Sequence, residues 1–313
     1  MTFEVLLINP VIPMLDEALR ARYTVHRLYE HADKQGWLRE VGANIEGVVT
    51  GGASGIDNDT MSRLPKLRIV AINGIGTDAV DLDYARSRGI HVSTTPGVLT
   101  DDVADLAIGL LLAATRGLCT GDRYVRDGQW VAKAPLPLAR KFSGMKLGIV
   151  GLGRVGRAIA ARAAAFNCEI AYTDLRAMSD VPYRFVDDLH TLASQSDALV
   201  LAASADTAEG IVDARILDAL GSDGWLINVA RGKLVNEADL VQALAQKRIA
   251  GAGLDVFVDE PNVPAELLSF PNVVLQPHRA SATVQTREAM AAIVLDSLEA
   301  SFAGRRPETS VTP

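Results

Sequence analysis

The sequence predicts an α/β protein in which two doubly wound parallel sheets form two domains. Short apolar runs typical of buried strands alternate with helical patterns along most of the chain. The alternation comes in two series, one on each side of a long apolar helical pattern that starts near residue 100. A length of 313 residues is sufficient for two domains, each with its own core.

The first series covers the N-terminal third of the chain. Its strand-like runs are FEVLLIN (3–9), IEGVVTGG (45–52), LRIVAING (67–74) and IHVST (90–94). Helical patterns lie between these runs at 14–23, 57–65 and 79–89. This alternation favours a parallel sheet that is covered by helices.

The second series follows the long helix, for which Thr100 is the expected N-cap. Its strand-like runs are KLGIVG (146–151), EIAYTD (169–174), ALVLAA (198–203), GWLINVA (224–230), GAGLDVF (251–257) and NVVLQ (272–276). A last helix ends at Gly304, and the polar tail after it is expected to fray.

Composition limits the partners and the location. The net charge of −7 gives no electrostatic reason to expect nucleic acid or an anionic membrane as a partner. The longest apolar stretch, 106–115, is too short to span a bilayer, and the first residues lack the features of a signal peptide. Cys119 and Cys168 form no Cys-x-x-Cys motif, which favours structural thiols in a reducing compartment. We expect a cytoplasmic protein without a metal site.

The clearest motif is a G-x-G-x-x-G sequence at residues 151–156, directly after a predicted strand and at the start of an Ala-rich helix. This context is typical of dinucleotide binding, because the glycines allow a tight turn and the helix N-terminus faces the pyrophosphate. A purely structural glycine-rich turn is the alternative. The expected cofactor contacts of this loop are Gly151, Leu152, Gly153, Arg154, Val155 and Gly156.

An acidic residue closes the next predicted strand. Asp174 follows Gly156 by 18 residues, where a carboxylate binds the adenosine ribose hydroxyls and repels a 2′-phosphate. This favours NAD over NADP. Arg154 and Arg176 keep NADP as an alternative, because an arginine fork binds phosphate well.

These signals predict a Rossmann-type cofactor domain inserted in a flavodoxin-like substrate domain. The substrate domain would comprise residues 1–98 and 284–313, and the cofactor domain with a dimerisation helix residues 99–283. Ligands are expected in the cleft between the two domains.

Three further strand ends carry polar residues: Arg231, then Asp255 with Glu260, then His278. A structural histidine is the alternative for His278, although Pro277 fixes the backbone before it. Reduction of a 2-oxo acid needs a cation for the substrate's carboxylate and carbonyl oxygen, and an acid that protonates this oxygen. An arginine, a carboxylate and an imidazole at adjacent strand ends match these requirements.

The motifs TDDVADLAIGLLLA, GLGRVGRAIA, LINVARGKLVNEADLVQAL, GAGLDVFVDEPNVP and NVVLQPH together resemble the D-2-hydroxyacid dehydrogenases. Within them, the chain is most similar to the glyoxylate/hydroxypyruvate and hydroxyphenylpyruvate reductases. The resemblance covers about residues 45–304. It implies that Arg231 binds and polarises the substrate, that His278 exchanges the proton and that Glu260 orients His278.

The resemblance also implies contacts elsewhere. Backbone groups at Gly52, Ile75 and Gly76 would hold the substrate carboxylate. The implied nicotinamide contacts are Val103, Val229, Ala230 and Asp255. Members of the family are homodimers, with the helix after Pro96 in the interface, and Trp130 matches a tryptophan that some relatives direct toward the partner's active site.

The chain departs from the family pattern at three places. Asp174 stands where NADPH-preferring reductases of this group have a Ser-Arg type of pattern. Arg279 follows His278 where Val or Ile is usual, and its side chain either adds a cation beside His278 or points to solvent. Ala203, Ala205 and Ala208 replace the usual Pro and Thr residues near the cofactor. Two other functions remain open, a non-catalytic NAD-sensing protein of the same fold and a short phosphoglycerate dehydrogenase.

Overall fold

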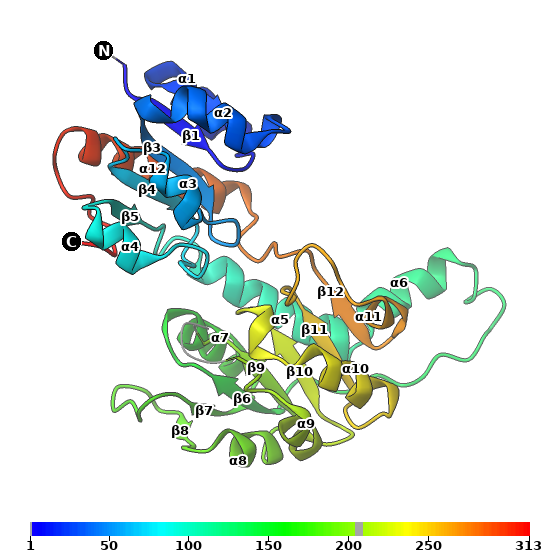
Figure 1. The fold of residues 1–313 in the computed structure, drawn as a ribbon. Helices are drawn as coiled ribbons and strands as arrows, with labels where there is room; N and C mark the ends of the chain where they lie inside the picture. The colour runs from blue at the N-terminus through cyan, green and yellow to red at the C-terminus, as the bar shows by residue number, and fades with distance from the viewer. Residues whose placement is uncertain (1, 204–208) are drawn as a thin grey trace. The chain divides into compact units, whose positions relative to one another are not determined.

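The computed structural model describes residues 2–203 and 209–313. The chain divides into two compact units (Figure 1). Unit 1 comprises Met1–Leu99 and Ala282–Pro313, and unit 2 comprises Thr100–Ser281. The first boundary lies one residue after the expected one, and the second lies two residues before it.

Unit 1 is built around a five-stranded parallel sheet with the strand order β2-β1-β3-β4-β5. This is the flavodoxin-like order, as predicted. Its elements are β1 (Glu4–Leu7), α1 (Pro13–Arg22), β2 (Thr24–Arg27), η1 (Leu28–Glu30), α2 (Lys34–Val41), η2 (Gly42–Asn44), β3 (Ile45–Gly51), α3 (Asn58–Ser62), β4 (Ile69–Asn73), α4 (Leu82–Ser87), β5 (His91–Ser93) and α12 (Val284–Phe302).

Both faces of this sheet are buried. Val5 and Leu7 of β1 pack with Leu15 of α1 and with Leu298 of α12, whereas Leu6 belongs to the cluster on the opposite face. This alternation follows from the period of two in a strand. The sequence did not predict β2, because this edge strand, TVHR, has no continuous apolar run.

Unit 2 is built around a seven-stranded parallel sheet with the strand order β12-β11-β10-β9-β6-β7-β8. With β6 counted as strand 1 and the sheet read from β8 to β12, the order is 3-2-1-4-5-6-7. This is the 3-2-1-4-5-6 order of a Rossmann sheet with one further strand, β12, at its edge. Its elements are α5 (Thr100–Thr115), α6 (Leu118–Arg126), β6 (Lys146–Val150), α7 (Arg154–Ala164), β7 (Glu169–Thr173), β8 (Arg184–Phe185), α8 (Leu189–Ser194), β9 (Ala198–Leu201), α9 (Ala214–Leu220), β10 (Trp225–Asn228), η3 (Gly232–Leu234), α10 (Glu237–Ala245), β11 (Gly251–Leu254), α11 (Ala265–Ser269) and β12 (Val273–Leu275).

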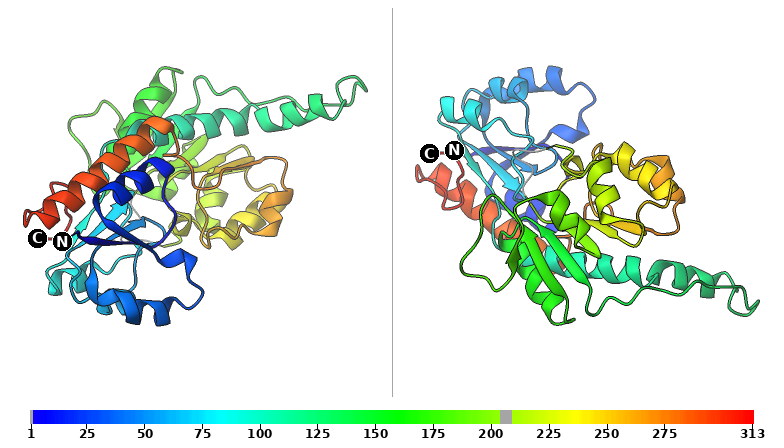
Figure 2. Two further views of the ribbon diagram at one scale, coloured as in Figure 1. Left: turned by 90° about the horizontal axis from the view of Figure 1, so that it is seen from above. Right: turned by 90° about the horizontal axis from the view of Figure 1, so that it is seen from below.

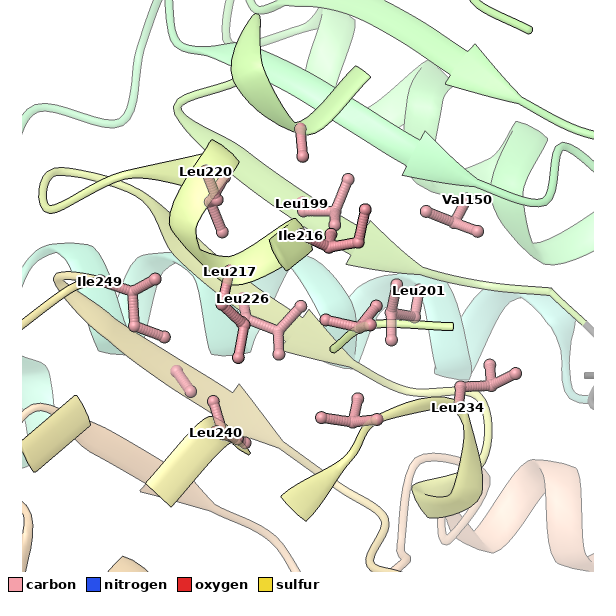
Figure 3. Packing of buried hydrophobic residues seen from close by; sticks show 14 of the residues in the cluster. Val150, Leu199, Leu201, Ile216, Leu217, Leu220, Leu226, Leu234, Leu240 and Ile249 are labelled. Atoms are coloured by element: carbon pink, nitrogen blue, oxygen red, sulfur yellow. The ribbon is translucent and has the colours of Figure 1, made fainter. Parts of the chain in front are cut away.

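An aliphatic core fixes the central strands of this sheet. Figure 3 shows Leu199 and Leu226 of neighbouring strands beside Ile216 and Leu217 of α9. Complete burial of one such side chain contributes about 1.5–3 kcal/mol relative to leaving it exposed. The strand ends that carry polar residues are therefore held by a well-packed core.

Helix α6 and the segment that follows it extend away from the sheet of unit 2 (Figure 1 and Figure 2). Every residue of α6 is exposed or only partly buried. Val125 is 54% exposed and Trp130 is 68% exposed. No single helix in the described part of the chain is long and apolar enough to cross a membrane, although α5 and α6, bent by 59°, would pass this test together by length and composition.

The expectation that the C-terminal tail frays is wrong. Ser310 forms an antiparallel bridge with Ser93, and the N–H of Val311 donates to the carbonyl of Val92 at 2.8 Å. Thr312 is 1% exposed, and its hydroxyl accepts from the N–H of Val92 at 2.8 Å and donates to the carbonyl of Ile90 at 3.0 Å. The tail is ordered because β5 is an edge strand with backbone groups available for pairing.

We predict that Thr312→Val destabilises unit 1. The substitution keeps the shape but removes both hydroxyl hydrogen bonds and leaves the Val92 N–H unsatisfied, which costs about 1–3 kcal/mol. Hydrogen–deuterium exchange should show faster exchange at Val92, and urea unfolding should show a lower midpoint. Glu308→Ala, at an exposed position of the same tail, is the matched control. Equal exchange rates in the two variants would contradict the docked tail.

Candidate active site

The glycine-rich loop between β6 and α7 depends on its glycines for steric reasons. Gly151 has φ +87°, and a Cβ at this position would lie 2.6 Å from the Cα of Ala203. A Cβ at Gly156 would lie 2.0 Å from the carbonyl oxygen of Gly151. By contrast, no heavy atom of the described chain lies within 4 Å of a Cβ built on Gly153. Two glycines close the turn, and the third leaves open space in front of it.

This loop fits the pyrophosphate of a dinucleotide. Gly153 is the N-cap of the 11-residue helix α7, and no side chain of the described residues caps this helix. Its first N–H groups and the positive end of its dipole suit a phosphate at the open position. Arg154 is exposed, Val155 is partly buried and Leu152 is buried.

Asp174 follows β7 and is hydrogen-bonded to the glycine-rich loop. One carboxylate oxygen accepts from the N–H of Leu152 and the other from the N–H of Leu175, both at 2.7 Å. Each oxygen keeps a further lone pair for a ribose hydroxyl. Arg176 is exposed. Arg157, which the sequence did not single out, binds both carboxylate oxygens of Asp180 at 2.8 and 3.0 Å.

Arg231 is positioned by a polar residue that the sequence analysis missed. Asn228, the last residue of β10, is 1% exposed. Its amide accepts from the N–H of Ala230 at 3.0 Å and donates to the carbonyl of Arg231 at 2.8 Å. The bonds fix the turn Val229–Ala230–Arg231. The available signal was a lone asparagine at the end of an apolar strand.

His278 lies in a loop that is held by Asp255. Its backbone has φ +46°, which is unusual for a residue other than glycine. The N–H of His278 donates to the carbonyl of Asp255 at 2.7 Å. The Asp255 carboxylate accepts from the N–H groups of Arg279 at 2.8 Å and of Ala280 at 3.0 Å. These three bonds hold the histidine in its strained conformation.

Asp255 is 1% exposed. Burial raises the pKa of its carboxyl, and the two N–H donors oppose this shift only in part. The sequence analysis implied a contact with the nicotinamide carboxamide, which stays a prediction. The structure adds a role in holding the His278 loop.

His278 and Glu260 form a close pair. The Nδ1 atom of His278 lies 2.6 Å from the Oε2 atom of Glu260, and the Oε1 atom accepts from the N–H of Phe257 at 3.1 Å. Burial alone would raise the pKa of Glu260, but the hydrogen bonds from His278 and Phe257, with the charges of His278 and Arg231, lower it. An ionised Glu260 fixes Nδ1 as a donor and leaves Nε2 for a substrate.

The structure places only some of the residues at which the sequence departs from the family pattern. The Arg279 side chain is exposed, and its backbone N–H makes the contact to Asp255. Ala203 lies against Gly151, because a Cβ at Gly151 would lie 2.6 Å from the Cα of Ala203. Ala205 and Ala208 lie outside the described residues. Val103, in α5, is 8% exposed.

The remaining predicted substrate contacts lie in unit 1, at the carboxyl ends of the neighbouring strands β3 and β4. A Cβ at Gly52 would lie 3.2 Å from the carbonyl oxygen of Gly76, so the two loops are in contact. Ile75 is 45% exposed. Asn9, which follows β1, supports this site, because its side-chain oxygen accepts from the N–H of Gly51 at 2.9 Å. The structure thus brings Gly52 and Gly76 together.

Within residues 2–203 and 209–313, the structure contains no group of three or more histidine, cysteine, aspartate and glutamate residues that could hold a metal ion.

Comparisons with known proteins cover the whole chain. The family model "D-isomer specific 2-hydroxyacid dehydrogenase, NAD binding domain" matches residues 108–280. The 2-ketogluconate reductase of Gluconobacter oxydans (strain 621H) is 45% identical over 311 residues, which are 99% of this chain and 98% of that protein. A glyoxylate/hydroxypyruvate reductase of Arabidopsis thaliana is 45% identical over 308 residues, 98% of each chain.

A solved structure gives the same result. The NADPH-dependent glyoxylate/hydroxypyruvate reductase of Sinorhizobium meliloti, in complex with NADP and malonate, has a TM-score of 0.90 and is 39% identical, with 99% of this chain and 97% of that chain covered. The family and fold predicted from the motifs are therefore confirmed. Because relatives with 45% identity match over nearly its full length, the chain belongs to the D-2-hydroxyacid dehydrogenase family.

Proposed function

We propose that the protein reduces a small 2-oxo acid to the D-2-hydroxy acid, with His278 as the proton donor. The observation that carries this proposal is the 2.6 Å contact between His278 Nδ1 and Glu260 Oε2. A bound nicotinamide supplies the hydride to the carbonyl carbon. The Nε2–H of His278 protonates the carbonyl oxygen, and Glu260 stabilises the imidazolium before transfer. Arg231 binds the substrate's carboxylate and polarises its carbonyl.

The proposed substrates are glyoxylate, hydroxypyruvate and related 2-oxo acids. The names of the Arabidopsis and Sinorhizobium proteins support the first two, and the name of the Gluconobacter protein adds a longer sugar acid, 2-ketogluconate. Aryl-pyruvates are a third proposed class of substrate, because the motifs also resemble the hydroxyphenylpyruvate reductases. An NAD-sensing role without turnover and a phosphoglycerate dehydrogenase activity are the alternatives. The hydrogen-bonded His278–Glu260 pair favours catalysis over the sensing role, because cofactor binding alone does not require a proton donor.

We propose NADH as the preferred cofactor. The support is Asp174, whose carboxylate lies against the glycine-rich loop through Leu152 and would repel a 2′-phosphate. The Sinorhizobium protein is NADPH-dependent, so both cofactors must be tested.

We also propose a cytoplasmic homodimer. The support for dimerisation is the apolar surface on and after α6, which includes Val125, Trp130 and Leu138. Exposed large apolar side chains that are gathered in one segment are typical of protein interfaces. The reduced cysteines Cys119 and Cys168 support the cytoplasm.

The pH dependence tests the proton donor. Reduction needs protonated His278, so its rate should fall as the pH rises, and the rate of oxidation should rise. Glu260→Gln removes the negative charge that favours the imidazolium, so both profiles should move to lower pH. His278→Ala should lower kcat by about 100- to 10,000-fold, while the Kd for NADH changes little. Full activity of His278→Ala with glyoxylate and hydroxypyruvate would refute the mechanism.

Cofactor preference tests the role of Asp174. Asp174→Ser should move the ratio of kcat/KM for NADH and NADPH toward NADPH by roughly tenfold, or ~1.4 kcal/mol, because it removes the repulsion of the 2′-phosphate. Asp187→Ser, which removes an exposed carboxylate elsewhere in unit 2, should leave the ratio unchanged. A wild-type enzyme tenfold better with NADPH would reverse the assignment and point to Arg154 or Arg176.

Light scattering tests the dimer. Wild-type protein should have twice the mass of the chain, and Val125→Asp combined with Trp130→Glu should shift it toward the monomer, because charges replace buried apolar contacts. Gln129→Glu adds a charge in the same segment without removing an apolar side chain, and should remain dimeric. A monomeric wild-type protein would exclude the proposed assembly.

A further inference from the structure

Glu237, the first residue of α10, makes a contact outside its own helix. The N-cap of α10 is Asn236, whose side chain accepts from the N–H of Asp239 at 3.2 Å. The Glu237 carboxylate instead accepts from the N–H of Val258 at 2.9 Å, through its Oε1 atom. Val258 lies two residues before Glu260, in the segment that follows β11. Glu237 therefore joins α10 to the segment that carries Glu260.

Two carboxylates bind successive N–H groups of this segment. Glu260 binds the N–H of Phe257 at 3.1 Å, and Glu237 binds the next one, that of Val258. With its Oε1 atom held by Phe257, Glu260 presents its Oε2 atom to His278 at 2.6 Å. The geometry of the His278–Glu260 pair thus depends on the conformation of residues 257–260.

A second contact to the segment 257–260 comes from Gly232. A Cβ at Gly232 would lie 1.9 Å from the carbonyl carbon of Phe257 and 2.0 Å from its oxygen. The backbones at Gly232 and Phe257 are therefore in direct contact. Gly232 directly follows Arg231. The stretch from Arg231 to Glu237 therefore contacts the Glu260 segment near its start, through Gly232 and Phe257, and at its end, through Glu237 and Val258.

We propose that Glu237 is a positioning residue, which holds the Glu260 segment beside the Arg231 turn and thereby sets the orientation of His278. The proposal rests on the roles of His278 and Glu260 in the proposed function. Neither the sequence motifs nor the family resemblance assigned a role to Glu237. The positioning comes from the hydrogen-bond acceptor and not from the charge of this carboxylate.

The electrostatic surroundings of Glu237 agree with such a role. Burial raises the pKa of its carboxyl, the Val258 N–H lowers it, and the nearby Asp259 and Glu260 raise it further. Among residues 2–203 and 209–313, no lysine, arginine or histidine forms an ion pair with this carboxylate. Its contact with Val258 gives it a function that a glutamine could keep, because the amide oxygen is also an acceptor.

A purely structural role is the competing account, because an acidic residue in the first turn stabilises a helix through the dipole. Asp239 provides a matched control. It lies in the same first turn, and its carboxylate accepts from the N–H of Ala214, the first residue of α9, at 3.0 Å. Both residues connect α10 to backbone of another segment, but only Glu237 contacts the segment that carries Glu260.

The experiment compares Glu237→Ala, Glu237→Gln and Asp239→Ala by kcat, KM, pH profile, NADH affinity and thermal unfolding. Glu237→Ala should lower kcat about tenfold and move the pH profile of reduction to lower pH, because a displaced Glu260 no longer supports the imidazolium. Glu237→Gln should stay within about threefold of wild type in kcat, because it retains the acceptor for Val258. Asp239→Ala should keep the wild-type kcat and pH profile, whatever its effect on thermal unfolding. NADH affinity should be unchanged in all three.

A double-mutant cycle with Glu260→Gln is decisive. If Glu237 acts through Glu260, the tenfold loss caused by Glu237→Ala should largely disappear in the Glu260→Gln background. A loss that adds fully to that of Glu260→Gln, or an equal loss in Asp239→Ala, would overturn the proposal. A Glu237→Gln variant as impaired as Glu237→Ala would overturn the acceptor role. If Glu260→Gln itself has no effect on kcat or on the pH profile, Glu237 cannot act through Glu260 and the proposal is overturned. Full activity of His278→Ala would refute the proposed function separately, so the two failures are distinguishable.

Discussion

The site in unit 2 depends on one interaction above all, the capture of backbone N–H groups by the buried carboxylate of Asp255. This carboxylate accepts from the N–H groups of Arg279 and Ala280, and the backbone carbonyl of Asp255 accepts from the N–H of His278. The arrangement holds a histidine at φ +46°, a conformation that a free loop would populate rarely. A proton donor must be held in one place relative to the reacting atoms, because misplacement costs much of the gain from orientation.

The same device recurs around the sheet of unit 2. Side-chain oxygens bind backbone N–H groups of the loops at the carboxyl ends of its strands. Asn228 and Glu260 bind within their own loops, to Ala230 and Phe257, whereas Asp174 and Glu237 bind another segment, at Leu152 and Val258. Parallel strands make this possible, since their carboxyl ends lie at one end of the sheet and bring several loops together there. The loops lack regular secondary structure, so their backbone groups need partners of this kind.

The glycine-rich loop shows how sterics and electrostatics act together. Gly151 and Gly156 are required because a Cβ would collide with Ala203 and with the loop itself, whereas Gly153 leaves the helix N-terminus accessible. The Asp174 carboxylate fastens the loop to β7 and brings a negative charge to the place where the adenosine ribose is expected. Asp174 therefore both holds the geometry of the loop and carries the proposed preference for NADH.

The sequence by itself determined the α/β class, the two sheets and the glycine-rich loop, because these depend on local periodicity and on residues next to strand ends. It also named Arg231, Glu260 and His278 as candidate site residues, because each stands at or shortly after the end of a predicted strand. Only the tertiary structure decided the docking of Thr312 on the β5 edge, the edge strand β2, and the supporting roles of Asn228, Asp255 and Glu237. The physical reason is that these features are hydrogen bonds and pairings to backbone groups, most of them in other segments of the chain. A backbone N–H is the same in nearly every residue, so nothing in the sequence marks which one a side chain will bind until the fold brings them together.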